Sequence, residues 1–288
     1  MQMKKCIFII VAMLTASCSL TPNLDMVGMF YGQSPRNDTR FEQSLEYNKE
    51  HGVCRTLALP SDNYKVYVAT DMHVDSTWRN LTEFCTRAQA DAESPFTLIL
   101  GDVINAQNNY PHFMEGMKPL AKTWFCTAGN HDIYFGQWQQ YLETIGSSTY
   151  WFVAQTPSAK DLFICLDSSD GTLGRKQLKW VKDLLAVKTA EGYRHIIVFT
   201  HTHLFKRDAS QGHTSNYTLE ETYELTDLFA RNGVEWYLCG HDHSREVTEM
   251  KGVKYIIVDA IEDPEKKPGY LIAHIGDKLT YEFIDLKP

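Results

Sequence analysis

The chain has 288 residues, of which 43% are hydrophobic and 12% aromatic, so it can bury a sizeable core and is not expected to be disordered. Its formal net charge of −8 repels the phosphates of nucleic acids, which excludes a nucleic-acid scaffold as the expected partner. An anionic small substrate would need positive charge concentrated at one site, and bound metal ions can supply it.

The first residues have the layout of a secretory signal peptide. Two lysines precede the apolar run of residues 6–14, and small residues follow as far as Cys18. This apolar run is shorter than a membrane-spanning helix requires. We therefore expect residues 1–17 to be a signal peptide and the protein to be exported.

The stretch LTASC, residues 14–18, resembles the lipobox of bacterial lipoproteins, in which the cysteine is lipidated and becomes the mature N-terminus. Thr15 departs from that pattern, which prefers leucine at this position. The resemblance implies a cell-envelope protein, periplasmic or surface-exposed, that is attached to a membrane through a lipid on Cys18. Cleavage without lipidation and an uncleaved anchor stay open as alternatives.

Residues 18–62 are mostly polar and are expected to form a lipidated tether and an N-terminal extension, in which a short helix ends at Gly52. Residues 63–288 are expected to form one domain of alternating strands and helices. Strands are expected at 64–70, 95–101, 122–129, 149–155, 161–167, 194–200 and 234–239, with several short strands after Glu246. Helices are expected at 78–90, 135–146, 175–188 and 219–232. This alternation predicts an α/β layer fold, in which functional residues gather outside the carboxyl ends of the strands.

Five cysteines remain beyond the signal peptide and the candidate lipid site. They are Cys54, Cys85, Cys126, Cys165 and Cys239. Their odd number and the absence of a CxxC pair favour buried free thiols, although an exported protein could form a disulfide.

Potential metal ligands follow five of the expected strands. They are Asp71 and His73, then Asp102, then Asn130 with His131 and Asp132, then His201, and finally His241 and His243. Each motif alone is weak, because a single histidine at a strand end is usually a structural residue. Together, their imidazole, carboxylate and amide groups suit Zn, Fe, Mn or Ni. They outnumber the four ligands of a structural zinc site and suit two metal ions.

Two pairs of these residues are separated by one position along the chain. Alternate side chains of an extended segment point the same way. We therefore expect Asp71 and His73 to converge in this manner, and His241 and His243 likewise.

The ordered motifs DxH, GD, GNHD, a strand-end histidine and GHxH resemble the calcineurin-like metallophosphoesterase superfamily, from about Tyr64 to Ser244. The resemblance implies a four-layer α/β/β/α sandwich with two mixed sheets. It also implies roles for the motif residues: Asp71, His73 and His243 on one metal, Asn130, His201 and His241 on a second, Asp102 bridging, and His131 assisting the leaving oxygen.

Two positions depart from the protein phosphatases of this superfamily. Asn105 stands where those enzymes have an aspartate that partners the catalytic histidine, and Ala128 stands where they have an arginine. A protein phosphatase is therefore not expected. The chain is more similar to the cyclic-nucleotide phosphodiesterase and purple-acid-phosphatase-like branches. We expect the Asn105 amide to orient His131 and to leave it less basic.

The resemblance implies a metal-dependent hydrolase of a small phosphorylated substrate, with two divalent or trivalent ions of Mn, Fe or Zn and a bridging hydroxide as the attacking group. Phosphomonoesters and phosphodiesters both stay open as substrates, as does the oligomeric state. The alternative is an envelope lipoprotein that contains metal and binds phosphorylated or glycan partners without turning them over.

Several other polar or aromatic residues were weighed for a role in the site. Asp132 could be catalytic, but we expect it to orient a neighbouring residue. Lys206, Arg207 and His213 could contact substrate, but we expect them to form a solvated loop. Trp151 and Trp180 are expected to pack in the core.

Overall fold

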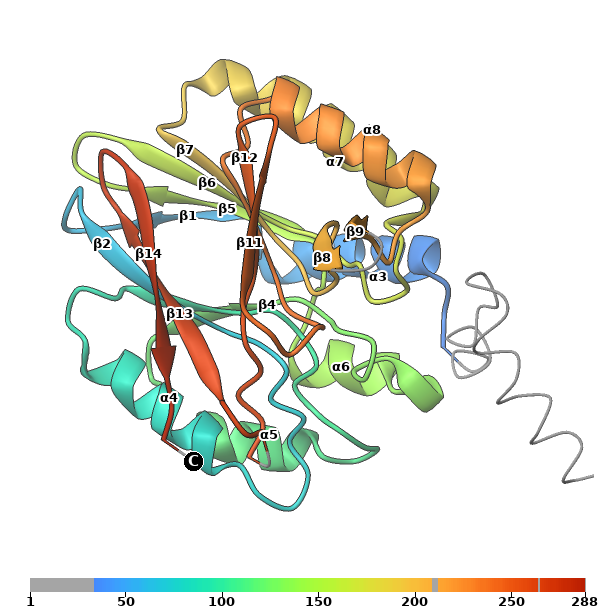
Figure 1. The fold of residues 1–288 in the computed structure, drawn as a ribbon, viewed down its shortest axis with the longest axis vertical. Coiled ribbons are helices and arrows are strands. Elements are labelled where there is room, and N and C mark those ends of the chain that lie inside the picture. Colours follow the sequence, from blue (N-terminus) through green and yellow to red (C-terminus); the bar gives the residue numbers. More distant parts are fainter. Residues whose placement is uncertain (1–33, 209–211, 264, 288) are drawn as a thin grey trace, which may run out of the picture.

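A computed structural model describes residues 34–208, 212–263 and 265–287 (Figure 1). The expected signal peptide and Cys18 lie outside these residues. No helix within the described ranges is long and apolar enough to cross a membrane.

Two mixed β-sheets face each other at the centre of the molecule (Figure 1). The seven-stranded sheet has the spatial order β1 (Arg55–Ala58), β5 (Tyr150–Gln155), β6 (Lys160–Cys165), β7 (His195–Phe199), β10 (Trp236–Cys239), β12 (Val253–Ile257) and β11 (Glu246–Met250). The five-stranded sheet has the order β14 (Leu279–Asp285), β13 (Gly269–Ile275), β2 (Tyr64–Ala69), β3 (Phe96–Ile99) and β4 (Thr123–Cys126).

Six α-helices in the described residues cover the outer faces of the sheets. Three of them lie on the side of the seven-stranded sheet: α3 (Asn37–His51), α7 (Gly174–Lys188) and α8 (Leu219–Arg231). The other three lie against the five-stranded sheet: α4 (Arg79–Ala90), α5 (Tyr110–Met117) and α6 (Trp138–Thr144). The predicted α/β/β/α sandwich with two mixed sheets is therefore confirmed.

Aromatic rings fill the space between the two sheets. Phe96 packs edge-to-face against Phe152 and Phe163, with ring centroids 5.3 Å apart in both pairs, and all three side chains are buried. Burying a side chain of this size contributes about 1.5–3 kcal/mol, and the edge-to-face geometry adds to it. This core sets the separation of the sheets and thereby the positions of the loops that follow their strands.

Most of the predicted elements are present, and the paired strands β5 and β6 are antiparallel. Helix α8 begins as predicted, with the Thr218 side chain accepting a hydrogen bond from the Glu221 N–H. Helix α5 and strand β1 were not predicted. The α5 segment contains Pro111 and Gly116, which read as breakers, but the proline lies in the first turn, where it costs no helical hydrogen bond.

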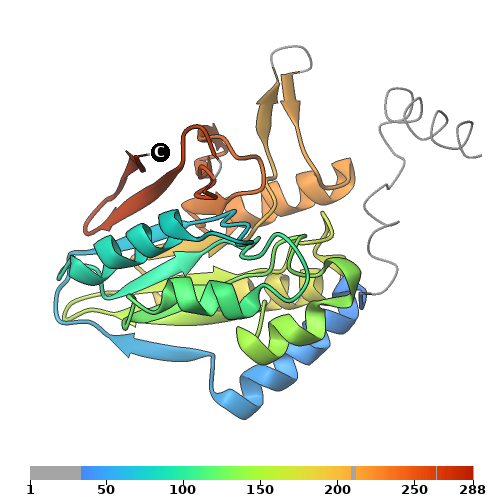
Figure 2. The same cartoon turned by 90° about the horizontal axis from the view of Figure 1, so that it is seen from below.

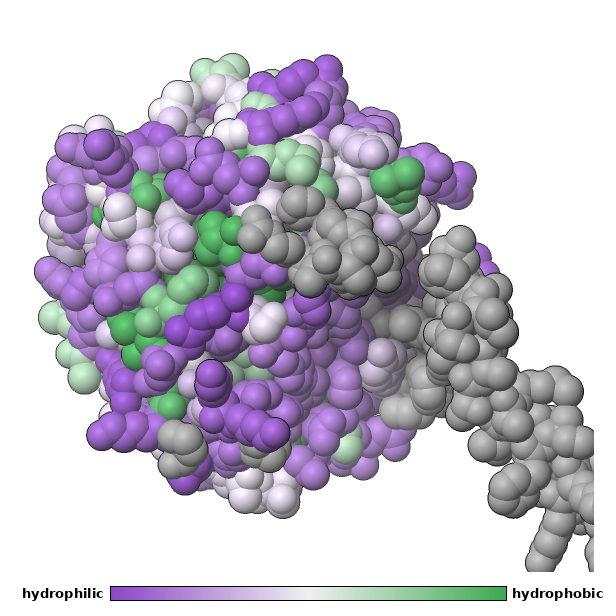
Figure 3. All heavy atoms as spheres, in the orientation of Figure 1, coloured by the Kyte–Doolittle hydropathy of each residue, from purple (hydrophilic) through white to green (hydrophobic). Residues whose placement is uncertain are grey.

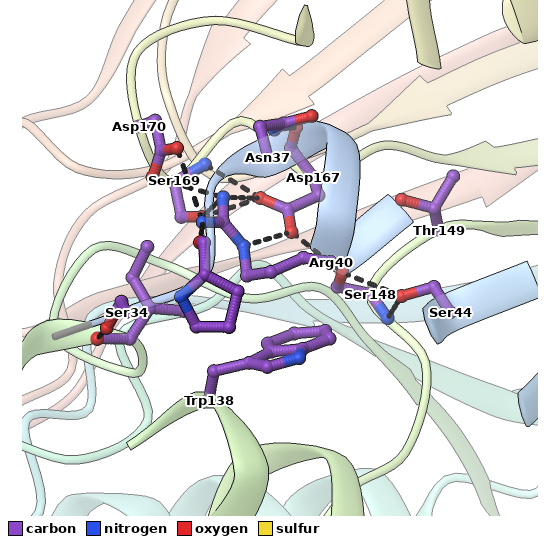
Figure 4. A network of polar contacts seen from close by, with 12 residues as sticks. Ser34, Asn37, Arg40, Ser44, Trp138, Ser148, Thr149, Asp167, Ser169 and Asp170 are labelled. Atoms are coloured by element: carbon purple, nitrogen blue, oxygen red, sulfur yellow. Dashed lines mark hydrogen bonds and ion pairs between the residues drawn. The ribbon is translucent and has the colours of Figure 1, made fainter. Parts of the chain in front are cut away.

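The N-terminal extension packs on the domain through α3, which ends at Gly52 as predicted. The Arg40 guanidinium donates to both oxygens of the Asp167 carboxylate, at 3.0 and 3.2 Å, and both side chains are fully buried (Figure 4). Ser148 also donates to Asp167, at 2.9 Å. This network joins α3 to the loop between β6 and α7.

The five cysteines of the described residues are all free thiols, as the sequence favoured. Trp151 and Trp180 pack against the apolar core between the seven-stranded sheet and helices α7 and α8, but they stay partly exposed. The face in Figure 3 is mostly hydrophilic, with apolar side chains in small groups. A hairpin of β8 (Lys206–Asp208) and β9 (Gly212–Thr214) projects from the body (Figure 2).

Candidate metal centre

The loops that follow β2, β3, β4, β7 and β10 meet at one place between the two sheets. Strands β2, β3 and β4 are parallel, and so are β7 and β10. Their carboxyl ends therefore lie at a common edge, where the polar side chains of the following loops converge.

The first group of potential ligands contains Asp71, His73 and His243. The Asp71 Oδ1 atom lies 3.7 Å from His73 Nε2 and 3.5 Å from His243 Nε2, and the two imidazole nitrogens are 3.1 Å apart. The other Asp71 oxygen accepts hydrogen bonds from the Thr70 hydroxyl and the His241 N–H, both at 2.8 Å. The Oδ1 atom is buried without any hydrogen-bond partner among the described residues.

The second group contains Asn130, His201 and His241. The His201 Nε2 atom lies 3.1 Å from Asn130 Oδ1 and 3.2 Å from His241 Nδ1. The Nδ1 atom of His201 is bonded to the Leu100 carbonyl at 2.8 Å. In the neutral ring that contact takes the proton at Nδ1 and leaves the Nε2 lone pair facing Asn130 and His241.

Asp102 lies between the two groups. Its Oδ2 atom is 3.7 Å from His73 Nε2 in the first group and 3.3 Å from His201 Nε2 in the second. Its Oδ1 atom accepts the His131 N–H at 2.8 Å. One carboxylate oxygen therefore faces both groups, which is the arrangement that a bridging ligand needs.

These donors fit two transition-metal ions. Nitrogen and oxygen ligands at about 2.0–2.2 Å from one metal are roughly 3.0–3.5 Å from each other, and the separations within both groups lie close to that range. The unpartnered Asp71 oxygen supports the same reading, because a buried carboxylate oxygen normally has a partner.

The charges of the site attract cations. Burial lowers the pKa of His73 and of His201, but the carboxylates of Asp71 and Asp102 outweigh burial and raise both values to about 9. Burial alone would raise the pKa of Asp102, and the neighbouring histidines instead hold it well below its usual range. Bound metal ions would take the place of these protons.

Five of the seven expected ligands have left-handed backbone conformations. Their φ angles are 50° for Asp71, 42° for His73, 51° for Asp102, 73° for His241 and 53° for His243. An extended backbone is therefore not what brings these side chains together, and that reason is wrong. Asp71 and His73 do meet in the first group, but His241 and His243 point into different groups. Such conformations cost about 1–3 kcal/mol each and cluster at functional sites.

His131 lies beside the first group, with its ring centroid 4.5 Å from that of His73. Its Nδ1 atom contacts the main-chain carbonyl oxygen of Asn105 at 3.3 Å. The expectation that the Asn105 amide orients this ring is therefore wrong, because the main chain performs that task and the Asn105 side chain is exposed. Burial lowers the pKa of His131, in the expected direction.

Asp132 is buried beneath the site and orients its neighbours. Its carboxylate accepts the N–H groups of Asp102, Val103 and Gly129, at 2.9, 3.0 and 2.8 Å. These contacts hold the GD and GNHD loops against each other. A side chain at Gly129 would clash with Asp102, so the close approach of the loops requires glycine there.

The solvated loop expected at Lys206, Arg207 and His213 is wrong, because these residues belong to the paired strands β8 and β9. Lys206 is paired with Asp242 between the two ligands of the GHDH motif. His203 is buried with its ring centroid 5.9 Å from that of His241, outside both ligand groups. The side chains of residues 207–214 are not described by the structure.

Two carboxylates at this site, Glu262 and Glu265, were not predicted from the sequence. Glu262 lines a cavity of about 230 Å³ together with His73, Asp102, His131 and other site residues. Glu265 lies 3.7 Å from His243 Nδ1. Both follow β12, which is parallel to β10, so the rule that function follows strand ends would have found them.

Comparisons with known proteins agree with this geometry. The model of the calcineurin-like phosphoesterase family matches residues 64–245. The chain is 32% identical over 116 residues to human tartrate-resistant acid phosphatase type 5, covering 37% of this chain and 33% of the relative. It thus spans about a third of the length of that curated relative.

Solved structures with low sequence identity share the fold. A purple acid phosphatase from yellow lupin seeds is 14% identical with a TM-score of 0.60, covering 79% of this chain and 52% of that one. GAP50, the anchor in the inner membrane complex of Plasmodium, is 13% identical with a TM-score of 0.56. The match covers 77% of this chain and 84% of GAP50. A putative 5′-nucleotidase from Staphylococcus aureus is 13% identical with a TM-score of 0.53, covering 78% and 55%.

Proposed function

This chain belongs to the calcineurin-like phosphoesterase family, and from that premise we propose that it is a metal-dependent hydrolase that cleaves phosphate esters at a dinuclear metal centre. The observation that carries the proposal is the position of Asp102, one of whose oxygens faces both ligand groups. A single metal ion would need only one of the two ligand groups, so the second group of histidines on the other side of Asp102 supports a second ion.

The seven expected ligands would hold the two ions, with Asp102 shared between them. Bound metal ions lower the pKa of water to near neutrality and neutralise charge on phosphoryl oxygens. The chain supplies the orientation: Asp132 fixes the loop of Asp102, and the Leu100 carbonyl fixes His201. Preorganised charge of this kind is usually the largest contribution to catalysis.

His131 would donate a proton to the leaving oxygen. Its Nδ1 atom faces the Asn105 carbonyl, so the proton for the leaving group would be held at Nε2. General acid catalysis of this type contributes about 10²–10⁴-fold to the rate. Burial lowers the pKa of His131, which makes the imidazolium a stronger acid but also reduces the share of the ring that carries this proton near neutral pH.

A direct assay tests the proposal. The protein, produced without its signal peptide, is loaded with Mn²⁺ and its bound metal is measured. It is then assayed on p-nitrophenyl phosphate and on bis(p-nitrophenyl) phosphate, with and without chelator. We expect two ions per chain and chelator-sensitive hydrolysis of at least one ester, and the ratio of the two rates decides between monoesterase and diesterase.

Two results would contradict the proposal. Hydrolysis that survives complete chelation would rule out the metal mechanism. Full occupancy of both sites without hydrolysis of any phosphate ester would instead favour a binding protein that does not turn over its ligand.

We further propose that the protein is exported to the cell envelope and held at a membrane by a lipid on Cys18. The signal-like N-terminus and the LTASC stretch support this proposal. The variant Cys18→Ala lacks the thiol that would carry the lipid. After cell fractionation it should therefore appear in the soluble fraction instead of the membrane fraction. Unchanged membrane association of this variant would argue for an uncleaved anchor.

A further inference from the structure

The cavity at the metal centre continues into an adjoining groove of about 380 Å³. Three residues line both spaces: His73, Asn105 and Glu262. The groove is lined further out by residues of the loop that follows the DxH motif, among them Ser76 and Thr77. A substrate bound at the metals could therefore extend into this groove without any rearrangement of the loops.

The groove lies on the side of the leaving group. His131, which would serve the leaving oxygen, lines the cavity next to Asn105, and its Nδ1 atom contacts the Asn105 carbonyl. Asn105 marks the junction of the cavity and the groove. The part of the substrate beyond the leaving oxygen is therefore expected to lie in the groove, beside Asn105 and Glu262.

The charge of the groove is negative. None of the described residues that line it is a lysine or an arginine, whereas three carry carboxylates: Asp75, Glu262 and Asp263. Two of these carboxylates have partners. Asp263 accepts the N–H groups of Arg79 and Asn80 at the N-terminus of α4, where the helix dipole offsets its charge.

Asp75 accepts a hydrogen bond from the Asn109 amide at 3.3 Å. Glu262 differs from both, because its carboxylate makes no hydrogen bond to the part of the chain that the structure describes. Its main chain is fixed, since its carbonyl accepts from the Asn80 amide at 3.0 Å. Its charge faces the imidazoles of His73 and His243, whose pKa values it helps to raise, and one of its oxygens lies within 4.8 Å of a ring nitrogen of His243. Glu262 is therefore the carboxylate of the groove that no hydrogen bond among the described residues holds in place, at the point where the groove meets the metal centre.

We propose that this groove is the leaving-group subsite and that Glu262 makes it select polar alcohols without negative charge. The inference rests on the proposed phosphoesterase function. Ser76, Thr77 and Asn105 offer hydroxyl and amide groups for the hydroxyls of a leaving alcohol. A phosphate or carboxylate on the leaving group would meet the charge of Glu262 and is disfavoured. An ammonium group is favoured for the same reason.

The experiment compares three phosphate esters of similar size whose leaving groups differ in charge. These are O-phosphoethanolamine with a cationic leaving group, glycerol 3-phosphate with a neutral one, and 3-phosphoglycerate with an anionic one. If the metal-loaded enzyme is a strict diesterase, the methyl diesters of the same compounds are used. The wild-type kcat/KM should fall in that order.

Glu262→Gln should raise the kcat/KM of the anionic ester about tenfold relative to the neutral ester, and Glu262→Lys should raise it further. Two unit charges roughly 10 Å apart at an effective dielectric constant of about 20 produce an effect of this size, and a shorter separation in the groove gives a larger one. The matched control is Asp183→Asn on the outer helix α7, which removes the same charge from an exposed position and should leave the ratio unchanged.

The outcomes separate this inference from the function on which it rests. Active Glu262 variants with an unchanged ratio would overturn the subsite. Loss of bound metal from Glu262→Gln would also overturn it, because Glu262 would then support the ligand His243 rather than the leaving group. If the wild-type protein hydrolyses no ester in the presence of metal, the phosphoesterase function itself fails, and the subsite fails with it.

Discussion

At the scale of single residues, the site depends on side chains with separate tasks. Asp71 uses one oxygen to accept from the Thr70 hydroxyl and the His241 N–H, and its other oxygen is buried with no hydrogen-bond partner among the described residues. Asp102 divides its oxygens in the same way, between the His131 N–H and the two histidine groups. A carboxylate that is fixed through one oxygen presents the other at a defined position. The side chain therefore needs little reorganisation when a metal ion binds.

Replacement of His131 and of Asp102 should separate catalysis from metal binding. His131→Ala should keep both metal ions and lose about 10²–10⁴-fold in kcat, because only the proton donor is removed. Asp102→Ala should lose metal as well, because the shared oxygen is removed. Metal content by elemental analysis and kcat on p-nitrophenyl phosphate check both variants. Full metal occupancy in Asp102→Ala would contradict the bridging role.

At the scale of elements, the N-terminal helix α3 is linked to the site through buried contacts. Arg40 of α3 binds Asp167, and the next residue, Ser168, contacts the Thr200 hydroxyl at 2.6 Å and the Thr202 N–H at 2.8 Å. Thr200 and Thr202 flank His201. The extension that precedes the domain therefore contributes to holding one of the expected ligands.

Breaking this link should destabilise the protein strongly. Arg40→Met leaves the buried Asp167 carboxylate without its charged partner, and such a loss costs about 3–5 kcal/mol. The control is Lys176→Met, which removes an exposed pair between α7 and Glu42 of α3 and should cost about 0–1 kcal/mol. Urea unfolding of the two variants measures the difference. Equal costs would show that the buried network does not secure α3.

A buried histidine links the two sheets and makes stability depend on pH. His195 Nδ1 lies 2.7 Å from the Glu235 carboxylate, and its Nε2 lies 2.8 Å from the Gly276 carbonyl in the β13–β14 turn. Burial alone would lower the pKa of His195, but these two acceptors raise it. A raised pKa in the folded state stabilises the fold below the ordinary histidine pKa, and that contribution is lost as the pH rises through the folded-state value.

The variant His195→Asn should therefore lower Tm more at about pH 5.5 than at about pH 9, since the ordinary pKa of histidine is about 6.5. Thermal unfolding of both proteins at the two pH values gives the comparison. The exposed His274, which faces Glu282 at 3.1 Å on the neighbouring strand β14, provides the control, and His274→Asn should show little change in Tm at either pH. An equal loss of Tm at both pH values for His195→Asn would contradict the charged interaction.

At the scale of the whole molecule, the site lies where the loops of both sheets meet. Asp71, Asp102 and Asn130 follow strands of the five-stranded sheet, and His201 and His241 follow strands of the seven-stranded sheet. Ions bound there would join the two halves of the sandwich. They would also relieve the repulsion between buried carboxylates.

Removal of metal should accordingly lower the stability of the whole domain. Ions that bind only the folded state stabilise it by about 2.7 kcal/mol at a concentration of 100 Kd. A domain of this size changes in Tm by roughly 2–4 °C per kcal/mol, so chelation should lower Tm by roughly 5–10 °C. Scanning calorimetry with and without chelator measures the change, and added Mn²⁺ should restore it. An unchanged Tm would place the ions outside the interface of the sheets.

The layer architecture and the types of ligand could be predicted from the sequence. The spacing of hydrophobic residues differs between strands and helices, so both can be predicted from short stretches of sequence. A potential metal ligand that directly follows a strand can be recognised from the order of residues alone. The five motifs therefore indicated both the edge of the sheets at which the site lies and the class of metal that it suits.

How these residues meet depends on the packing of the folded chain and could not be predicted. The position of the Asp102 oxygen between two histidine groups depends on the packing of two sheets. The Asn105 main chain supports His131, and Glu262 lines the cavity at the metal centre. Both depend on loop conformations and on contacts between residues far apart in the chain. Distances of that kind are set by core packing and by left-handed turns at the ligands, and neither has a local signature in the sequence.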